Sequence, residues 1–445
     1  MTSTRDGAIV LTEEFADGLN RLHRGDSLFL TGRAGTGKST LIREFLATTD
    51  RNVVVVATTG ITALGVGGQT VHNLFSFGAD VTVDQVRSDK YFPHRSAEAL
   101  RRIDTLVIDE VSMLRADLFD CLAIALERFG PRRGRPLGGV QLVLVGDLFQ
   151  LPPVVLDGEK DFFTTRYESP YFFSADCYAY ERFPTVELTR IFRQVGDVRL
   201  LEILDAVRSG TVGPRLLSEL NARTDSRFRA PVDEFWLTLT TTDRSARRRN
   251  LEQLDRLTGP EIRHRATESG ELEGFSPPTD TELVYKVGAQ IMLLTDDPLD
   301  RWAEGTIGQV RGHRVEGIEP VVTVVLPSGA QVDVRPHTWE MKKPVTDGDR
   351  LRSEVIGTFT QLPFELAWAV TIHKCQGQTL ENLVIDLTFA DGRLYVALSR
   401  STSMDGVVLQ RPVDVEDLKT DPRVRRFLRQ HRPSSNSRGG VYLEV

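Results

Sequence analysis

Short runs of apolar residues, separated by segments with helical periodicity, organise the first part of the chain. These runs have the length of strands, and the last three are rich in β-branched residues; they are Ser27 to Thr31, Val53 to Thr58, Thr105 to Ile108 and Gln141 to Val145. Ahead of the first run, Phe15, Leu19 and Leu22 recur at helical spacing. Continuous apolar strands that alternate with helices predict a parallel sheet covered on both faces.

A second group of strand-length runs predicts a second α/β domain of the same kind. The runs of this group are Phe235 to Thr240, Gln290 to Leu294, Ala369 to Ile372, Leu383 to Leu387 and Val407 to Leu409. Between Thr306 and Val334 glycines interrupt shorter apolar runs, a pattern typical of a small antiparallel barrel or hairpin. The expected fold class is therefore α/β, with two parallel-sheet domains and a small β insertion in the second.

These patterns predict a division of the chain into two domains with one insertion each. The first domain covers residues 1–190, and its insertion lies near residues 78–100, where the sequence is polar and weakly periodic. The second domain covers residues 191–300 and 351–432. Residues 301–350 form its β-barrel insertion.

Composition and charge narrow the class of protein. With 40% apolar and 26% charged residues among 445, the chain has the make-up of a soluble globular protein. No apolar run approaches the ~20 residues of a membrane-spanning helix, and the N-terminus lacks the apolar segment of a secretory signal. We therefore expect a cytoplasmic protein without membrane contact. The net charge of -7 is not that of a basic nucleic-acid-binding domain, although a local basic groove can lie on an acidic protein.

Cysteine spacing and low-complexity sequence exclude other classes. Cys121, Cys177 and Cys375 are too far apart for a CxxC metal site, and they do not predict a disulfide framework. No period of 20 to 50 residues is apparent, which excludes repeat architectures. Residues 433–445 contain many Pro, Ser, Asn and Gly residues, so we expect a loose tail.

The segment after the first predicted strand reads Gly-Arg-Ala-Gly-Thr-Gly-Lys-Ser, the full pattern of a phosphate-binding loop. It precedes the helical stretch Thr40 to Phe45, as such a loop requires. Its glycines allow successive backbone N–H groups to point at phosphate oxygens, and the helix adds its positive N-terminal end. Lys38 is the candidate to reach the β- and γ-phosphates, and Ser39 the candidate to contact Mg²⁺. The predicted nucleotide-binding residues of the loop are Gly32, Ala34, Gly35, Thr36, Gly37, Lys38, Ser39 and Thr40.

Two carboxylates follow the strand-like run Thr105 to Ile108. Asp109 and Glu110 then emerge at the carboxyl end of a strand, where open α/β sheets bind their ligands. Asp109 is the candidate to hold Mg²⁺ through its water shell, and Glu110 the candidate to polarise the attacking water. Together with the loop, these residues predict hydrolysis of a nucleoside triphosphate. They do not indicate what the energy drives.

Five further motifs follow the loop in a fixed order. They are Asp109 to Met113, Gly146 to Pro153, Phe192 to Gln194, Thr371 to Thr379 and Tyr395 to Arg400. This series resembles the ordered motifs of superfamily 1B 5′-to-3′ DNA helicases, and most closely the Pif-one-like and RecD-like group. Pro136 to Gln141 is also similar to the Pif-one-like pattern. The resemblance extends from about residue 11 to about residue 410 and is closest to a bacterial Pif-one-like protein.

The resemblance implies two RecA-like domains with ATP and Mg²⁺ in the cleft between them. Gln150 would then sense the γ-phosphate, and Gly377 would contact the nucleotide. Arg193 and Arg400 would be arginine fingers from the second domain, because charge spreads over the γ-phosphoryl oxygens in the transition state. If these arginines arrive only when the domains close, hydrolysis becomes conditional on conformation. The implied catalytic residues are Lys38, Asp109, Glu110, Gln150, Arg193 and Arg400.

The resemblance also implies that single-stranded DNA crosses the top of both domains. The implied DNA-contact residues are Thr58, Thr59, Gly60, Thr70, His72, Pro152, His373 and Lys374. Hydroxyl, imidazole and backbone N–H groups suit phosphate contacts that carry no sequence information. Phe75, Phe77 and Phe149 either stack on bases or belong to the core, which is the commoner fate of such residues. The basic cluster Arg244 to Arg249 either lines a DNA groove or forms a solvated helix face.

Further properties follow from the resemblance alone. It implies movement from 5′ to 3′, strand separation by the insertion near residues 78–100, and closure of the barrel over the DNA. The expected partners are single-stranded and forked duplex DNA, and the protein is expected to be a monomer with a role in DNA replication or repair. Two positions depart from the family pattern, because Phe15 and Arg393 stand where glutamine is usual. Phe15 puts adenine selectivity in question.

Three other functions compete with a helicase. A P-loop ATPase that loads or remodels a protein partner on DNA would hydrolyse ATP in response to protein rather than to single strands. A small-molecule kinase would need a lid and an acceptor pocket in a single α/β domain. A nucleic-acid-binding module without activity would not need the complete catalytic set.

Overall fold

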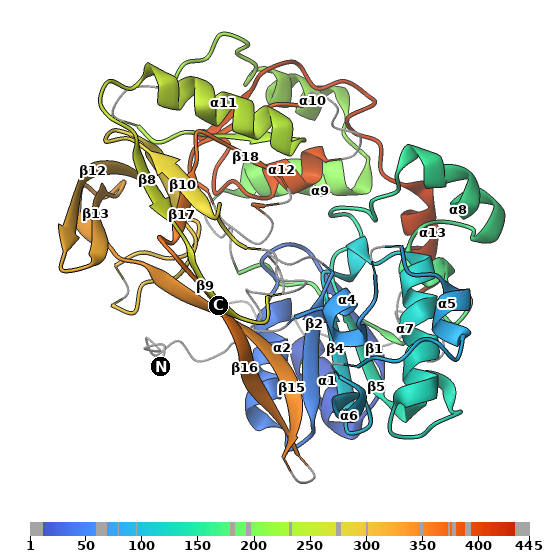
Figure 1. Ribbon diagram of the computed structural model, residues 1–445. Coiled ribbons are helices and arrows are strands. Elements are labelled where there is room, and N and C mark those ends of the chain that lie inside the picture. The colour runs from blue at the N-terminus through green and yellow to red at the C-terminus, as the bar shows by residue number, and fades with distance from the viewer. Residues whose placement is uncertain are drawn as a thin grey trace.

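The computed structural model contains two parallel sheets with antiparallel β structure beside them (Figure 1). The residues it describes are 12–58, 69–78, 80–94, 96–178, 183–192, 197–230, 234–272, 277–299, 301–347, 350–372, 374–375, 380–387 and 393–431. The predicted α/β fold class is confirmed.

The first parallel sheet has six strands in the order β3-β2-β4-β5-β1-β6. Its strands are β1 (Leu28–Gly32), β2 (Val53–Ala57), β3 (Gln69–Thr70), β4 (Thr105–Asp109), β5 (Gln141–Val145) and β6 (Thr185–Leu188). β1 and β5 are buried along their whole length, which is why their sequences are continuous apolar runs. The sequence predicts β1, β2, β4 and β5. It does not predict the short edge strands β3 and β6.

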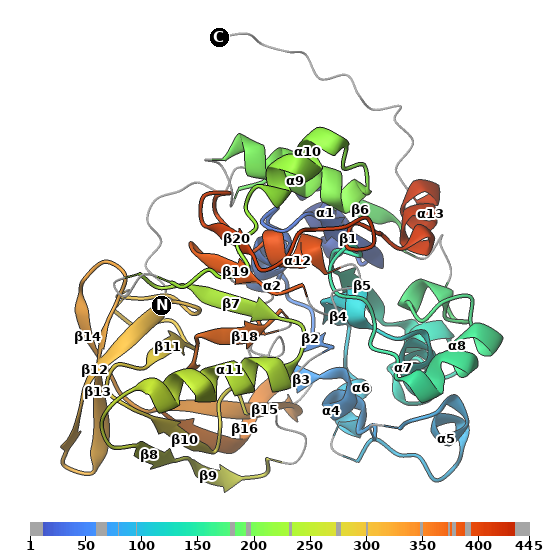
Figure 2. The same ribbon diagram turned by 90° about the horizontal axis from the view of Figure 1, so that it is seen from above.

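Helices cover both faces of this sheet (Figure 2). On one face, α1 (Glu13–Arg24) and α2 (Lys38–Thr48) bury Phe15 and neighbouring apolar side chains. On the other, α7 (Ala116–Phe129) buries Phe119. Phe15 is thus a core residue. The shorter helices and 3₁₀ turns of this part are α4 (Val71–Phe75), α5 (Val83–Arg87), α6 (Ala97–Leu100), α8 (Lys160–Arg166), η1 (Val111–Met113), η2 (Pro136–Gly139), η3 (Asp157–Glu159) and η4 (Phe172–Ser174).

The second parallel sheet has four strands in the order β18-β7-β19-β20. They are β7 (Leu237–Thr240), β18 (Ala369–Thr371), β19 (Leu383–Ile385) and β20 (Val407–Leu409), and the runs that the sequence marks at these four places are confirmed as parallel strands. The helices beside it are α9 (Val198–Ser209), α10 (Pro214–Asn221), α11 (Asp243–Arg256) and α12 (Leu394–Leu398).

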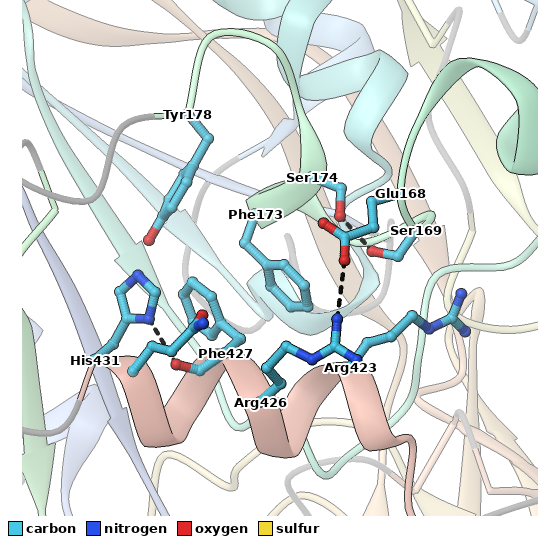
Figure 3. Close-up of a pocket in the computed structure, with 10 residues that line it drawn as sticks. Glu168, Ser169, Phe173, Ser174, Tyr178, Arg423, Arg426, Phe427 and His431 are labelled. Atoms are coloured by element: carbon cyan, nitrogen blue, oxygen red, sulfur yellow. Dashed lines mark hydrogen bonds and ion pairs between the residues drawn. The ribbon is translucent and has the colours of Figure 1, made fainter.

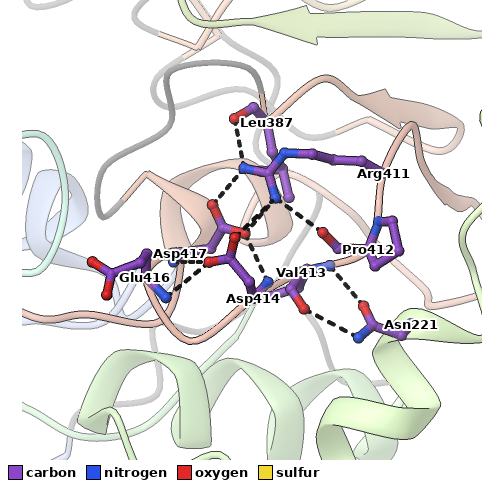
Figure 4. Close-up of polar contacts among 8 residues, drawn as sticks. All are labelled: Asn221, Leu387, Arg411, Pro412, Val413, Asp414, Glu416 and Asp417. Atoms are coloured by element: carbon purple, nitrogen blue, oxygen red, sulfur yellow. Dashed lines mark hydrogen bonds and ion pairs between the residues drawn. The ribbon is translucent and has the colours of Figure 1, made fainter.

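The chain that leaves β20 is fixed to the second domain by a polar cluster (Figure 4). Arg411 donates from both terminal nitrogens to the two carboxylate oxygens of Asp417, each over 2.7 Å. The side-chain amide of Asn221 exchanges two hydrogen bonds with the backbone of Val413. The bidentate ion pair and the two amide hydrogen bonds hold residues 411–417 in place beside the second sheet.

One predicted strand belongs to a different sheet from the one expected. Gln290 to Leu294 is predicted in the second parallel sheet, but β11 (Gln290–Leu293) lies in a five-stranded antiparallel sheet of order β14-β13-β12-β11-β17. The reason is that both faces of β11 are buried. Met292 packs into the core of the second parallel sheet, whereas Ile291 packs into the core of the antiparallel sheet, so the strand reads as a continuous apolar run. The other strands are β12 (Ile307–Glu316), β13 (Glu319–Val325), β14 (Gln331–Val334) and β17 (Phe364–Leu366).

A long hairpin extends from this region to the first domain (Figure 1). It consists of β15 (His337–Asp347) and β16 (Arg350–Gln361), which pairs in turn with β9 (Thr267–Gly270). Near the tip, the backbone N–H of Leu351 donates to Asn52 Oδ1 over 2.9 Å, and Leu351 packs against the core of the first domain. The β structure therefore extends beyond the predicted limits of residues 301–350, with β8 (Ile262–Arg265) and β10 (Glu282–Tyr285) forming a separate pair.

The last described helix, α13 (Pro422–Gln430), packs on the first domain, although the sequence analysis assigns it to the second. Phe427 stacks on Phe173 with ring centroids 4.3 Å apart, and Val424 joins the same core. The assignment is wrong because nothing local in a short amphipathic helix specifies which core receives its apolar face. In the part of the chain that the structure describes, no helix is long and apolar enough to cross a membrane.

Candidate functional site

The phosphate-binding loop connects β1 to the N-terminus of α2. Gly32 has φ of 151°, and a Cβ there would lie 2.5 Å from the backbone oxygen of Leu188. Gly37 is the N-cap of α2 with φ of 92°, a left-handed conformation that favours glycine. The glycines predicted from the sequence thus have steric and conformational reasons at these two positions. The hydroxyl-bearing residue Ser39 is exposed in the first turn of α2.

Lys38 is folded back onto the loop. Its Nζ donates to the backbone oxygens of Gly32 and Arg33 over 2.8 and 3.0 Å. Burial lowers the pKa of Lys38, and the negative charge of Asp147, followed by that of Glu110, opposes the shift. A phosphate oxygen is a stronger acceptor than a neutral carbonyl, so this ammonium is positioned to exchange loop oxygens for phosphate.

Asp109 and Glu110 lie together at the end of β4, as the sequence analysis expects. Glu110 has φ of 51°, a left-handed conformation that is costly for a residue with a side chain, and its backbone N–H donates to Asp109 Oδ1 over 2.8 Å. Burial, and then the charge of Asp109, raises the pKa of Glu110 to about 7. Burial also raises the pKa of Asp109. A half-buried carboxyl group with a pKa near neutrality is suited to act as a general base.

The loop after β5 brings Asp147 and Gln150 to the same cleft. Both are buried, and the backbone N–H of Gln150 donates to the backbone oxygen of Asp147 over 2.9 Å. Two groups of the second domain converge on the Asp147 carboxylate. The hydroxyl of Tyr395 donates to Oδ2 over 3.0 Å, and Arg208 Nη2 donates to Oδ1 over 3.3 Å. Asp147 is therefore a contact point between the two domains.

Arg400 is buried and projects from the end of α12. Its guanidinium donates to the backbone oxygens of Val396 and Cys375 and to Ser399 Oγ, over 3.2, 3.3 and 2.8 Å respectively. Its positive charge acts on Glu110 and counters the rise in the pKa of that carboxyl group. The structure thus brings a cation of the second sheet close to the acidic end of β4 in the first.

Some predicted nucleotide-site residues fall on segments that are not described. Arg193 and Gly377 lie outside the described residues. The residue before Arg193, Phe192, donates its backbone N–H to the backbone oxygen of Gly35 over 2.9 Å, so the chain reaches the phosphate-binding loop at that point.

The predicted DNA-contact residues are only partly covered by the structure. Thr59, Gly60 and His373 lie outside the described residues. Thr70 caps α4, where its hydroxyl accepts from the backbone N–H of Asn73 over 3.1 Å. His72 follows in the first turn of α4, and burial lowers its pKa. Thr58 Oγ1 donates to the backbone oxygen of Glu110 over 3.3 Å, and Pro152 is half-buried beyond the loop after β5.

Lys374 is engaged within the protein. Its Nζ lies 2.6 Å from Glu365 Oε2. Burial raises the pKa of Glu365, whereas the charge of Lys374 opposes that shift. The Glu365 carboxylate therefore competes with any phosphate for this ammonium.

The alternatives for the aromatic and basic residues are resolved for several of them. Phe75 and Phe77 are buried and stacked, with centroids 5.3 Å apart, so the expectation that they are core residues is confirmed. Phe149 is half-buried and lies beneath the Arg208 guanidinium. The basic cluster lies on α11, where Arg244, Arg247 and Arg248 are exposed. These three arginines therefore lie on a solvated face of the helix.

A separate hollow of about 210 Å³ lies between α13 and the first domain (Figure 3). Arg423, Arg426 and Phe427 line it from α13, and Glu168 faces Arg426 at 3.2 Å across it. None of the residues that line it belongs to the predicted ATP or DNA set. The hollow follows from the docking of α13.

The sequence analysis missed three residues of the cleft as site candidates. Asp147 and Tyr395 lie within motifs that it recognised, but the motifs alone do not indicate that the two side chains meet. Arg208 has no local signal, since it is one of many arginines and lies in the last turn of an ordinary helix. Only the packing of α9 against the loop after β5 reveals it.

Comparison with known proteins gives a consistent result. Residues 13–207 match the model of the family described as PIF1-like helicase. The chain is 32% identical to the ATP-dependent DNA helicase Pif1 of Bdellovibrio bacteriovorus over 435 residues, covering 95% of this chain and 92% of that protein. The human protein of the same name is longer, and this chain covers 63% of it at 33% identity.

Solved structures agree with the sequence comparison. The Bacteroides sp. Pif1 structure in complex with ADP-AlF4 has a TM-score of 0.85 and 30% identity, and the alignment covers 95% of this chain and 97% of that one. A Bacteroides Pif1 structure in complex with ADP-AlF3 and single-stranded DNA has a TM-score of 0.69 at 30% identity, with 96% and 99% of the two chains covered. The overall fold is therefore shared with proteins captured with nucleotide.

Proposed function

The chain belongs to the PIF1-like helicase family, and we propose that it is an ATP-dependent DNA helicase that moves 5′ to 3′ on single-stranded DNA and unwinds duplex DNA. The observation that carries this proposal is that side chains of both domains face the same cleft. Arg400 acts on Glu110 across the cleft, and Tyr395 contacts Asp147. A site assembled from two domains makes hydrolysis depend on their relative position, as a motor requires.

Within this cleft each side chain has a distinct task in hydrolysis. Lys38 and the N–H groups of the loop bind the phosphates and hold the γ-phosphoryl group in place. Glu110, when deprotonated, accepts a proton from the attacking water. Arg400 neutralises charge that develops on the γ-phosphoryl oxygens, and Gln150 positions the water or senses the γ-phosphate. Arg193 supplies a second cation in this proposal.

The residues present suit Mg²⁺. The exposed Ser39 hydroxyl and the Asp109 carboxylate offer hard oxygen ligands, and Mg²⁺ characteristically combines one or two such ligands with phosphate oxygens and water. Mg²⁺ would supply charge neutralisation between the β- and γ-phosphates. Ser39 and Asp109 are the residues that would hold it.

We place single-stranded DNA across the ends of both parallel sheets, on the predicted contact residues. The hydroxyls of Thr58 and Thr70 and the imidazole of His72 suit backbone phosphates. Lys374 Nζ lies 2.6 Å from the Glu365 carboxylate, so a phosphate that approaches its remaining donors does so against the negative charge of that carboxylate. In this proposal the protein acts on single-stranded and forked DNA as a monomer, and we place it in the bacterial cytoplasm.

The decisive test is steady-state ATP hydrolysis with and without single-stranded DNA. Strong stimulation that disappears in Lys38→Ala is the expected result. Unwinding of forks with a 5′ tail, but not of those with only a 3′ tail, tests the direction of movement. Turnover that is unaffected by DNA but responds to a protein partner would instead favour the loading or remodelling ATPase.

A further inference from the structure

Arg208 is a largely buried cation of the second domain that contacts the first. It lies in the last turn of α9, and only 12% of its side chain is exposed. Its Nη2 donates to Asp147 Oδ1 over 3.3 Å, and its Cζ lies 4.4 Å from the centroid of the Phe149 ring. Among the described residues, no hydrogen-bond partner reaches its buried Nε. A planar guanidinium that both stacks and forms an ion pair is held in one orientation.

The two side chains beneath Arg208 connect it to the nucleotide site. Asp147 is completely buried, and its charge is the largest one opposing the fall in the pKa of Lys38, whereas the charge of Arg208 adds to that fall. The negative charge of Asp147 thus acts on Lys38 in the first domain, and the same carboxylate pairs with Arg208 of the second. Any anion that binds Lys38 changes the balance of charge that both cations experience.

Phe149 extends the connection from charge to packing. It packs against the core of the first parallel sheet and also against the core of the second. It immediately precedes Gln150, whose backbone N–H is bonded to Asp147. A shift of α9 therefore acts on Phe149 and Asp147 together, and through the backbone on Gln150.

We propose that Arg208 is a positioning residue that couples the nucleotide site to the movement of the second domain. It does so through its ion pair with Asp147 and its stacking on Phe149, which lie beside Gln150. This inference rests on the proposed ATP-driven helicase function. Arg208 acts through these two residues and is not assigned a contact with ATP. Its role is to pass domain movement to Gln150, so its loss uncouples DNA binding from hydrolysis.

The test measures ATP hydrolysis by the full chain with and without an oligothymidylate strand. Arg208→Ala is expected to lower the DNA stimulation factor roughly tenfold, which is a typical size for coupling between two sites. Affinity for a fluorescent ATP analogue should change by less than about twofold, because the loop and Lys38 are intact. Thermal unfolding of each variant checks that the domains remain folded.

Two matched variants separate coupling from loss of charge. Arg199→Ala removes another arginine of α9, which pairs with Glu202 and Glu219 at the surface, and should leave stimulation unchanged. Arg208→Lys keeps the charge beside Asp147 but loses the planar stacking on Phe149, so it should restore only part of the stimulation. Combining Arg208→Ala with Phe149→Leu should lower stimulation little further than Arg208→Ala alone.

The outcomes distinguish this inference from the proposed function. If the unmodified protein is not stimulated by DNA, the helicase proposal fails. If it is stimulated and Arg208→Ala is stimulated equally, the positioning role is wrong. The role is also wrong if Arg208→Ala loses nucleotide affinity and thermal stability in parallel, since that pattern identifies a merely structural residue.

Discussion

The two parallel sheets have the same layered architecture but carry opposite chemistry. The first presents the phosphate-binding loop together with the carboxylates Asp109, Glu110 and Asp147. The second presents cations, of which Arg400 is buried and Arg208 largely buried at the cleft. In the proposed mechanism phosphate binding therefore belongs to the first sheet, whereas compensation of charge in the transition state depends on both. The comparison teaches that the proposed hydrolysis needs side chains from both sheets.

The largest expected effect on the rate of ATP hydrolysis comes from removing Arg400, the buried arginine beside the second sheet. Arg400→Ala should bind ATP normally and hydrolyse it about 10³-fold more slowly, the lower end of the range for an arginine finger. Single-turnover hydrolysis and equilibrium binding of an ATP analogue provide the measurement. Normal turnover by this variant would remove Arg400 from the proposed role.

A change in the first sheet should separate nucleotide chemistry from DNA binding. Lys38→Ala is expected to reduce hydrolysis about 10²- to 10³-fold, since it removes one preorganised donor from the phosphates. Binding to single-stranded DNA in nucleotide-free buffer should persist, as fluorescence anisotropy can show. Loss of that binding would contradict the assignment of Lys38 to the nucleotide alone.

The association of α13 with the first sheet can be broken by a single truncation. Phe427 is buried against Phe173, and Phe427→Ala should lower the free energy of unfolding of the first domain by about 3 kcal/mol. The change is measured by guanidinium denaturation, with proteolytic cleavage of the first domain as the readout of its unfolding. Arg429→Ala, at an exposed position of the same helix, is the matched control and should cost less. Equal effects of the two changes would argue against specific docking of α13.

The smallest predicted effect concerns pH. Burial raises the pKa of Glu110 to about 7, and the general base acts only when deprotonated, so activity should rise with pH. The value of kcat/KM should be about tenfold lower at pH 6 than at pH 8. Glu110→Gln should give a low and flat profile over this range. A flat profile in the unmodified protein would exclude Glu110 as the titrating base.

Much of the first domain could be predicted because its signals are local. A strand, a glycine-rich loop and a helix follow one another within a few residues, and the steric environment of Gly32 explains why that position has no side chain. Asp109 and Glu110 were expected at the end of β4 because buried parallel strands deliver their next residues to one edge of the sheet. The strain at Glu110 could not be expected, since its φ of 51° is not encoded by glycine or asparagine.

The wrong predictions have a common cause. A local sequence pattern does not indicate which distant segment a strand, helix or side chain will contact. β11 is apolar on both faces because two cores enclose it, so its sequence resembles that of a parallel strand. The β15–β16 hairpin was not predicted because many of its residues are polar or half-buried, and Leu351 gains its burial from the distant first domain. The sequence does not show that Lys374 pairs with Glu365, because the two residues lie nine positions apart and only the fold brings them together.

The amino-acid sequence by itself determined the α/β class, the phosphate-binding loop and the ordered motifs, because each depends on residues that are close together in the chain. Only the tertiary structure decided which charges face one another. Asp147, Arg208 and Tyr395 meet across two domains, and α13 returns to the first domain from the far end of the chain. Long-range contacts of this kind form when whole surfaces of distant elements pack together. Hydrophobic periodicity shows which face of one element is apolar, but not which other face packs against it.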